Sequence, residues 1–296
     1  MTRPPRVGHI PFLNCHPLLL GMHETGAIAE FDLVQGTPTE LARLALAGEL
    51  DVTPLSAIEY LRHADEFELL PNLAIGATGA VRSVQLVGKV APAQLTGPVA
   101  MTNASATSQV LLALLLDELW SVDLQCYSCN VELPQVFEHA EAALLIGDEA
   151  LRLAASCPEG LHLADLGTAW AELTGLPMTY AVWAARRDFA DAQRSQLETV
   201  TDGLTKSLAW GCAHIGSVIA DARTRESLSE WELADYFNRL EYGFDDRAKA
   251  GLETFADRAC AHGFLDRVPN FEYPGLEHSD FERPGFERPG FEFAAA

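Results

Sequence analysis

The first third of the sequence alternates between strand-like and helix-like hydrophobic patterns, and this alternation restricts the possible folds more than any other feature. Short apolar runs that are typical of buried strands occur at residues 6–13, 30–38 and 50–56. Between the last two lies a helical pattern over 37–50, which Thr37 or Thr39 can cap and Gly48 can end. Strands that alternate with helices predict a mostly parallel sheet with helices on both faces.

The rest of the chain predicts a second block of this kind and then a purely helical part. Two strand-like runs at 68–79 and 82–90 lead into the second block, and a strand near 178–188 precedes a series of helices. We therefore expect an α/β clamp of two lobes, each a mixed, mostly parallel sheet flanked by helices. The first lobe is expected to comprise residues 1–85 and 179–272 with the C-terminal helices, the second lobe 86–178, and a tail 273–296. A cleft between two such lobes is a natural small-molecule site.

Composition narrows the possible partners. The chain has 296 residues, 48% of them hydrophobic, and 20 Lys and Arg against 42 Asp and Glu give a formal charge of −22. Such an acidic chain argues against nucleic acid and against an anionic membrane as partners. The apolar stretch near the N-terminus is too short for a secretory signal, and no run reaches the ~18 apolar residues of a membrane span, so we expect a cytoplasmic protein.

Two further features carry little chemistry. Cys126 and Cys129 form a C-x-x-C pair without a second pair or a nearby His pair, so we expect no metal and no cofactor there. The pentapeptide F-E-R-P-G occurs twice over 281–290. Its Pro and Gly residues exclude helix and strand interiors, and the tail is expected to be disordered or to lie along the surface.

Asn14 is the first candidate site residue. It lies in the turn between the strand at 6–13 and a helix that Pro17 can open. Open α/β sheets bind their ligands at the carboxyl ends of strands, where this turn is expected. The alternative is that Asn14 was selected for turn geometry or a local backbone hydrogen bond.

Three other strand ends are expected to face the same cleft. Ser56 follows one strand and can cap a helix, Arg82 and Ser83 begin another strand, and "MTNASATSQV" at 101–110 joins a strand to a helix. The free N–H groups of a helix N-terminus bind carboxylate or phosphate, and the hydroxyls at 105, 107 and 108 add donors. The alternative for 101–110 is an ordinary helix cap.

A fifth strand ends at Ile146 and turns at Gly147 into another helix. Gly147 leaves space for a ligand, and Asp148 either faces that ligand or caps the helix. His9 and His16 flank Asn14 without a carboxylate nearby in sequence. The sequence has no G-x-S-x-G, P-loop or G-x-G-x-x-G motif, which disfavours serine hydrolysis, nucleotide hydrolysis and dinucleotide chemistry.

Several of these stretches together resemble the chorismate dehydratase family, whose members open the futalosine route to menaquinone. The resemblance is carried by 6–18, 48–89, 101–112, 142–152 and 165–187. It implies the fold of type II periplasmic binding proteins. The implied reaction converts chorismate, a small dicarboxylate, into 3-[(1-carboxyvinyl)oxy]benzoate and water without a cofactor.

The resemblance also implies roles for the candidate residues. Asn14 becomes the catalytic residue. The substrate-binding set is then Ser56, Arg82, Ser83, Ser105, Ala106, Thr107, Gly147 and Asp148. Of these, Ser105, Ala106 and Thr107 are expected to hold one carboxylate at a helix N-terminus, with Ser56 and Ser83 around the other.

Two alternatives are weighed against this reading. The sister family, 1,4-dihydroxy-6-naphthoate synthase, has an Asp where this chain has Asn14 and a catalytic His where it has Gly147. Both departures favour the dehydratase. A non-catalytic small-anion binding protein of this fold is expected to be exported, and the sequence shows no signal or lipid-attachment segment.

Overall fold

The computed structural model describes residues 3–156 and 158–273. Its strands are β1 Arg6–His9, β2 Asp32–Gln35, β3 Val52–Ser56, β4 Phe67–Ala77, β5 Val84–Gly88, β6 Val99–Thr102, β7 Cys126–Cys129, β8 Ala142–Ile146, β9 His162–Asp165, β10 Met178–Arg186 and β11 Leu240–Glu241. Its α-helices are α1 His16–Thr25, α2 Pro38–Leu46, α3 Ala57–Arg62, α4 Ala106–Glu118, α5 Gly147–Ser156, α6 Leu166–Thr174, α7 Arg187–Ala192, α8 Arg194–Ala213, α9 Ile215–Ala222, α10 Glu230–Arg239 and α11 Asp246–Ala261. The expected alternation of strands and helices is present.

The strands form two mixed sheets, with the orders β11-β4-β10-β3-β1-β2 and β7-β6-β8-β5-β9. In the first sheet β1 is parallel to β2 and β3, whereas β10 runs antiparallel to both β3 and β4. In the second sheet β6 is parallel to β7 and β8, whereas β5 runs antiparallel to β8 and β9. The expected mixed, mostly parallel sheets are present, because β1, β2, β3 and β4 share one direction in the first sheet and β6, β7, β8 and β9 share one direction in the second. Two strands of the first sheet, β10 and β11, and one strand of the second, β5, run against the others. The chain enters the second lobe by β5 and re-enters the first lobe by β10.

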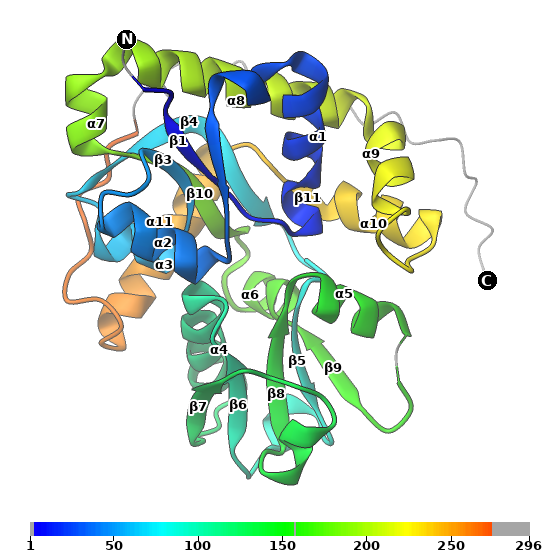
Figure 1. The fold of residues 1–296 in the computed structure, drawn as a ribbon. Helices are drawn as coiled ribbons and strands as arrows, with labels where there is room; N and C mark the ends of the chain where they lie inside the picture. The colour runs from blue at the N-terminus through cyan, green and yellow to red at the C-terminus, as the bar shows by residue number, and fades with distance from the viewer. Residues whose placement is uncertain (1–2, 157, 274–296) are drawn as a thin grey trace.

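Figure 1 shows the two sheets in separate lobes, with α4, α5 and α6 around the second sheet and the other helices around the first. The chain passes between the lobes twice, at 78–83 and at 175–177. We propose the division into a lobe of 1–85 with 179–272 and a lobe of 86–178. Sheet membership supports these bounds to within two residues, because β5 begins at Val84 in the second sheet and β10 begins at Met178 in the first. None of the helices in the described part of the chain is long and apolar enough to cross a membrane.

Helix α1, which follows the Asn14 turn, packs closely against α8. A side chain added at Gly21 would collide with the carbonyl group of Ser207, and one added at Gly211 would collide with that of Pro17. The two glycines therefore let the helix backbones touch, which fixes the start of α1 from behind. The Asn14 turn is consequently built on a rigid support.

The described part of the chain extends one residue into the expected tail. Tyr273 stacks on Phe271 at 5.7 Å between ring centroids, and its hydroxyl donates to Glu253 Oε1 at 3.0 Å. The repeat itself lies in 274–296, outside the described residues.

We predict that deleting 274–296 leaves the thermal midpoint almost unchanged, because a Pro- and Gly-rich repeat cannot build a packed core. Deleting from Tyr273 onward should lower stability further, since an aromatic pair such as Tyr273 with Phe271 contributes about 0.5–1.5 kcal/mol beyond its area. Differential scanning calorimetry of the two truncations provides the comparison. If the chain without 274–296 fails to fold, the repeat is structural.

Candidate functional site

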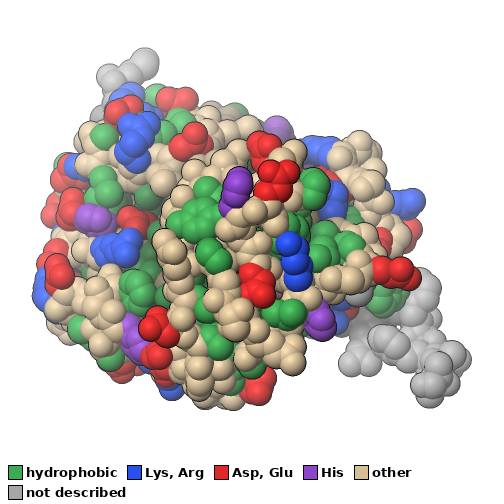
Figure 2. All heavy atoms as spheres, turned by 90° about the horizontal axis from the view of Figure 1, so that it is seen from below, with side chains coloured by type: hydrophobic (Ala, Val, Ile, Leu, Met, Phe, Trp, Pro, Cys, Tyr) green, Lys and Arg blue, Asp and Glu red, His purple; other side chains and the backbone are tan. Residues whose placement is uncertain are grey.

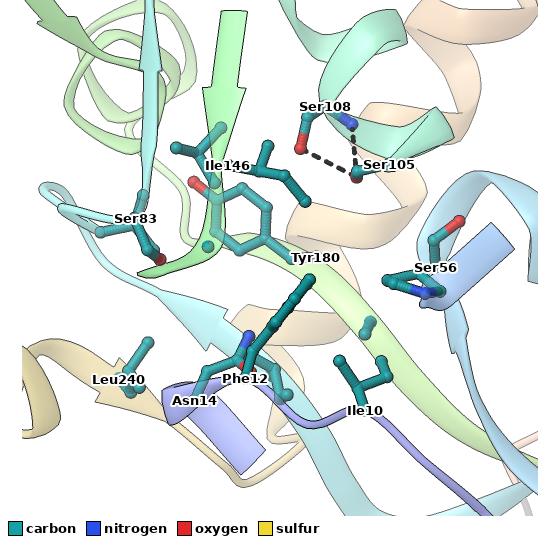
Figure 3. A pocket seen from close by; sticks show the side chains of 16 residues that line it. Ile10, Phe12, Asn14, Ser56, Ser83, Ser105, Ser108, Ile146, Tyr180 and Leu240 are labelled. Atoms are coloured by element: carbon teal, nitrogen blue, oxygen red, sulfur yellow. Dashed lines mark hydrogen bonds between the residues drawn. The ribbon is translucent and has the colours of Figure 1, made fainter. Parts of the chain in front are cut away.

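A cavity lies between the two lobes and encloses about 580 Å³ of empty space, its mouth included. This volume is within the range of small-molecule sites. Its polar lining residues are Asn14, Ser56, Ser83, Ser105, Ser108 and Tyr180. The other described residues that line it are apolar side chains and Gly147, so none of them carries a charge. In Figure 3, Phe12 and Asn14 lie opposite Ser105 and Ser108, with Ser83 and Ser56 on the two remaining sides.

Asn14 lies in a short 3-10 helix, Leu13–Cys15, between β1 and α1. Its Oδ1 is buried and has no hydrogen-bond partner in the protein. The alternative reading, a local backbone hydrogen bond by this oxygen, is therefore not what the structure shows. A buried acceptor without a partner costs about 1–3 kcal/mol, so a donor on a ligand is the natural way to satisfy it.

Ser56 occupies the N-cap position of α3, but its side chain does not cap the helix. Its hydroxyl is buried, lines the cavity and has no partner in the protein. The cap comes from the other lobe, because Thr107 Oγ1 in α4 accepts the N–H of Ile58 at 2.9 Å. Thr107 is completely buried and is not among the cavity-lining residues. The expectation that Thr107 binds substrate is thus corrected: its hydroxyl caps α3, which leaves that of Ser56 free.

The start of α4 provides two hydroxyls. Ser105 caps α4 by accepting the N–H of Ser108 at 3.3 Å, and the two hydroxyl oxygens lie 3.0 Å apart (Figure 3). Both hydroxyls line the cavity, so the same residues that cap the helix are also available to a ligand. Ala106 does not line the cavity but faces an outer groove beside Met101, which corrects its assignment to the substrate-binding set.

The segment that enters β5 carries Ser83 to the cavity and Arg82 away from it. Ser83 Oγ accepts the hydroxyl hydrogen of Tyr236 at 3.1 Å, which leaves its own hydrogen available to a ligand. Arg82 has a φ of 66°, and its Nη1 lies 3.8 Å from Asp235 Oδ2 in α10. Arg82 is not among the described residues that line the cavity, so its expected place at the substrate is corrected to a place beside α10. The backbone turn at Arg82 is what presents Ser83.

Gly147 lines the cavity, whereas Asp148 faces away from it. Gly147 has a φ of 68°, and a Cβ at this position would lie 3.5 Å from the ring of Phe12. Asp148 Oδ1 accepts the N–H of Leu13 at 3.0 Å across the cleft. Burial raises the pKa of Asp148 to about 6, although the Leu13 hydrogen bond opposes this rise. The expected contact of Asp148 with substrate is replaced by this contact with the Asn14 turn.

Tyr180 is a site residue that the sequence did not indicate. It lies where the pairing of β10 with β4 shifts register between Thr179 and Ala181. Such irregularities re-aim side chains next to active sites, and the ring of Tyr180 lines the cavity. Its hydroxyl is buried without a partner, and burial raises its pKa.

The flanking histidines lie behind the Asn14 turn, in a second cavity that Asp148 also lines. Burial lowers the pKa of His9 to about 4, so this imidazole is neutral near pH 7. Burial also lowers the pKa of His16, whose Nε2 lies 2.9 Å from Asp221 Oδ2. Neither histidine lines the cavity between the lobes.

The His, Cys, Asp and Glu side chains of the described residues do not form a metal site. Cys126 and Cys129 are free thiols in β7, and within 3–156 and 158–273 no three or more His, Cys, Asp or Glu side chains form a group that could hold a metal ion.

Comparison with known proteins connects this geometry to a family. The model of a family described as menaquinone biosynthesis matches residues 5–261. The chain belongs to this family. It is also 30% identical over 270 residues to the chorismate dehydratase of Thermus thermophilus, with 86% of this chain and 95% of that protein covered.

Solved structures agree on the fold. A crystal structure of an Archaeoglobus fulgidus protein matches with a TM-score of 0.69 at 21% identity, covering 88% of this chain and 98% of that one. The periplasmic aliphatic sulphonate binding protein SsuA of Escherichia coli matches with a TM-score of 0.64 at 15% identity, covering 95% and 100%. The expected periplasmic-binding-protein-like fold is confirmed.

We predict that Thr107→Val lowers the free energy of unfolding by about 1–3 kcal/mol, because the variant leaves the buried N–H of Ile58 without its acceptor. Urea denaturation measures the change, with Thr199→Val on the exposed face of α8 as the matched control. Normal stability of Thr107→Val would contradict its role as the cap of α3.

Proposed function

We propose that this chain dehydrates chorismate to 3-[(1-carboxyvinyl)oxy]benzoate and water, at the start of a route to menaquinone. The observation that carries the proposal is the uncharged cavity between the lobes, where the buried Oδ1 of Asn14 and the hydroxyl of Ser56 lack protein partners. The family match and the chorismate dehydratase relative supply the reaction.

The reaction needs positioning more than it needs strong acids or bases. The C3–H bond of the substrate breaks, its electron pair forms the C3–C4 double bond, and the C4 hydroxyl leaves. The hydroxyl and the proton depart as water, and the ring becomes aromatic. Because aromatisation supplies the driving force, a cavity lined by hydroxyls, one amide and apolar groups is chemically sufficient. Orientation alone can contribute several kcal/mol to such a step.

The residues divide into two functions in this proposal. Asn14 is the catalytic amide, which either orients the enolpyruvyl carboxylate or hydrogen-bonds the departing hydroxyl. In the first case that carboxylate, part of the substrate itself, accepts the C3 proton. Ser105 and Ser108 at the N-terminus of α4 hold one carboxylate, and Ser56 and Ser83 surround the other. These four hydroxyls replace the cationic side chains that usually bind a dianion.

The geometry disfavours the sister activity, 1,4-dihydroxy-6-naphthoate synthesis. That activity implies a catalytic His at position 147. Here the φ of 68° strains any side chain. The chain shares its fold with the sulphonate-binding protein, so a role in binding without catalysis is the other candidate. A turnover assay distinguishes the two roles.

We predict that the purified chain converts chorismate to the benzoate product and that the rate survives exhaustive treatment with EDTA. Product formation is followed by liquid chromatography. Binding of chorismate without product would favour the binding-only role. Loss of activity that zinc restores would instead bring Cys126 and Cys129 back into consideration.

We predict that Asn14→Ala and Asn14→Asp each lower kcat by about a hundredfold or more, since a preorganised hydrogen-bonding group is lost. Asp also places a negative charge beside a dianionic substrate. The thermal midpoint should change little, because Asp tolerates the same turn conformations and the Asn14 oxygen forms no bond in the protein. Asn238→Asp on the exposed face of α10 is the control. Folded Asn14 variants with normal kcat would remove Asn14 from the mechanism.

A further inference from the structure

The turn that carries Asn14 is held from the opposite lobe. Leu13 is the first residue of its 3-10 helix, and the N–H of Leu13 donates to Asp148 Oδ1 at 3.0 Å. Asp148 lies in the first turn of α5, which belongs to the second lobe. The hydrogen bond therefore spans the cleft and ends one residue away from the Asn14 side chain.

Asp148 is itself fixed within the second lobe. The preceding Gly147 donates its N–H to the carbonyl of Ser83 at 2.8 Å, and β8 pairs with β5 along its length. The ring of Phe12 packs over the same glycine. The β8–α5 turn and the Asn14 turn thus meet through one hydrogen bond and one ring contact, and both contacts require the lobes to be closed.

We propose that Asp148 is a positioning residue, whose carboxylate fixes the Asn14 turn in its working geometry only when the two lobes close. The inference rests on the proposed function for the catalytic part of its test. It assigns Asp148 a role through Asn14 instead of a contact with substrate. A clamp built in this way completes its catalytic group at closure, so that an open clamp holds Asn14 without its support.

The surroundings of Asp148 make this hydrogen bond sensitive to pH. Its pKa is raised to about 6, chiefly by burial and also by the charge of Glu226, while the Leu13 hydrogen bond and Arg152 act in the opposite direction. The other titratable or charged groups that face it are His9, His16, Cys15, Arg225 and Tyr236. Burial lowers the pKa of His9 to about 4, so His9 is neutral where Asp148 titrates, and burial also lowers the pKa of His16. As pH rises through about 6, Asp148 becomes ionised and its bond to Leu13 becomes the stronger, charge-assisted kind.

The kinetic test compares three variants of the full chain. Asp148→Ala removes the acceptor and should lower kcat by about tenfold or more, the usual effect of losing a hydrogen bond to a charged group. Asp148→Asn keeps an acceptor oxygen and should remain within about threefold of the unmodified chain. Glu149→Ala removes an exposed carboxylate from the same helical turn and should change nothing. A normal kcat for Asp148→Ala, or equal losses in the Ala and Asn variants, would overturn the proposal.

The pH profile of kcat/KM separates positioning from a general effect on stability. The profile reports groups of the free enzyme, and substrate carboxylates ordinarily titrate near 4. The unmodified chain should gain kcat/KM as pH rises through about 6. Asp148→Asn should lack this inflection, because its amide does not titrate. An inflection that persists in Asp148→Asn would assign it to another group and contradict the inference.

A measurement without substrate keeps the inference separate from the proposed function. Amide hydrogen exchange at Leu13 should accelerate in Asp148→Ala but not in Glu149→Ala or Asp148→Asn. Absence of chorismate turnover in the unmodified chain would defeat the proposed function, whereas exchange would still test the link across the cleft. Unchanged exchange in Asp148→Ala would defeat the link itself. If Asp148→Ala shows faster exchange at Leu13 but a normal kcat, the contact is only structural, and the proposed positioning role of Asp148 is wrong.

Discussion

Four hydrogen-bond donors converge on the carboxylate of Asp165, and the shape of the cavity depends on them. They are the backbone N–H groups of Val81 (3.1 Å), Arg82 (2.6 Å) and Thr168 (3.0 Å) and the side-chain amide of Gln85 (2.8 Å). This network holds the first crossing between the lobes and stabilises the left-handed backbone of Arg82. Ser83 follows directly, and its carbonyl accepts the N–H of Gly147, which precedes Asp148. A continuous series of contacts therefore leads from Asp165 to the Asn14 turn.

Closure of the lobes also decides which hydroxyls remain available. Thr107 caps α3 from the other lobe, and Thr39 donates to the carbonyl of Asn103 at 3.2 Å across the same cleft. Because Thr107 accepts the free N–H of Ile58 at the start of α3, the hydroxyl of Ser56 is not needed as a cap and has no partner in the protein. Buried polar groups normally find partners, so unpaired ones that face a cavity mark the positions where a ligand completes the network.

The sequence predicts which chain segments reach the candidate cavity better than it predicts the directions of their side chains. Asn14, Ser56, Ser83, Ser105 and Gly147 were expected at strand ends, and all line the cavity, because strand ends converge at one edge of a sheet. Spacing along the chain does not show the direction of each side chain.

Four predicted substrate-binding residues lie away from the cavity for that reason. Arg82 points to α10, Thr107 caps α3 and Asp148 contacts the Asn14 turn. Ala106 faces an outer groove. Tyr180 was missed because a register shift within β10 leaves no trace in hydrophobic periodicity. The reversed directions of β5 and β10 depend on how the chain crosses between lobes, which local patterns do not record.

The uncharged lining of the cavity has a consequence for the rates at which ligands enter and leave. Acidic residues outnumber basic ones by 42 to 20 in the chain, and on the face that Figure 2 shows, acidic and basic side chains are interspersed with apolar ones. A dicarboxylate therefore approaches against the overall field, and none of the described residues that line the cavity offers a compensating cation. Salt screens this repulsion over about 8 Å at physiological ionic strength, so dissolved ions speed the arrival of such a ligand, the opposite of ordinary electrostatic steering. Under the proposed function, the same repulsion favours the departure of the anionic product, so slow capture and fast release have one electrostatic cause.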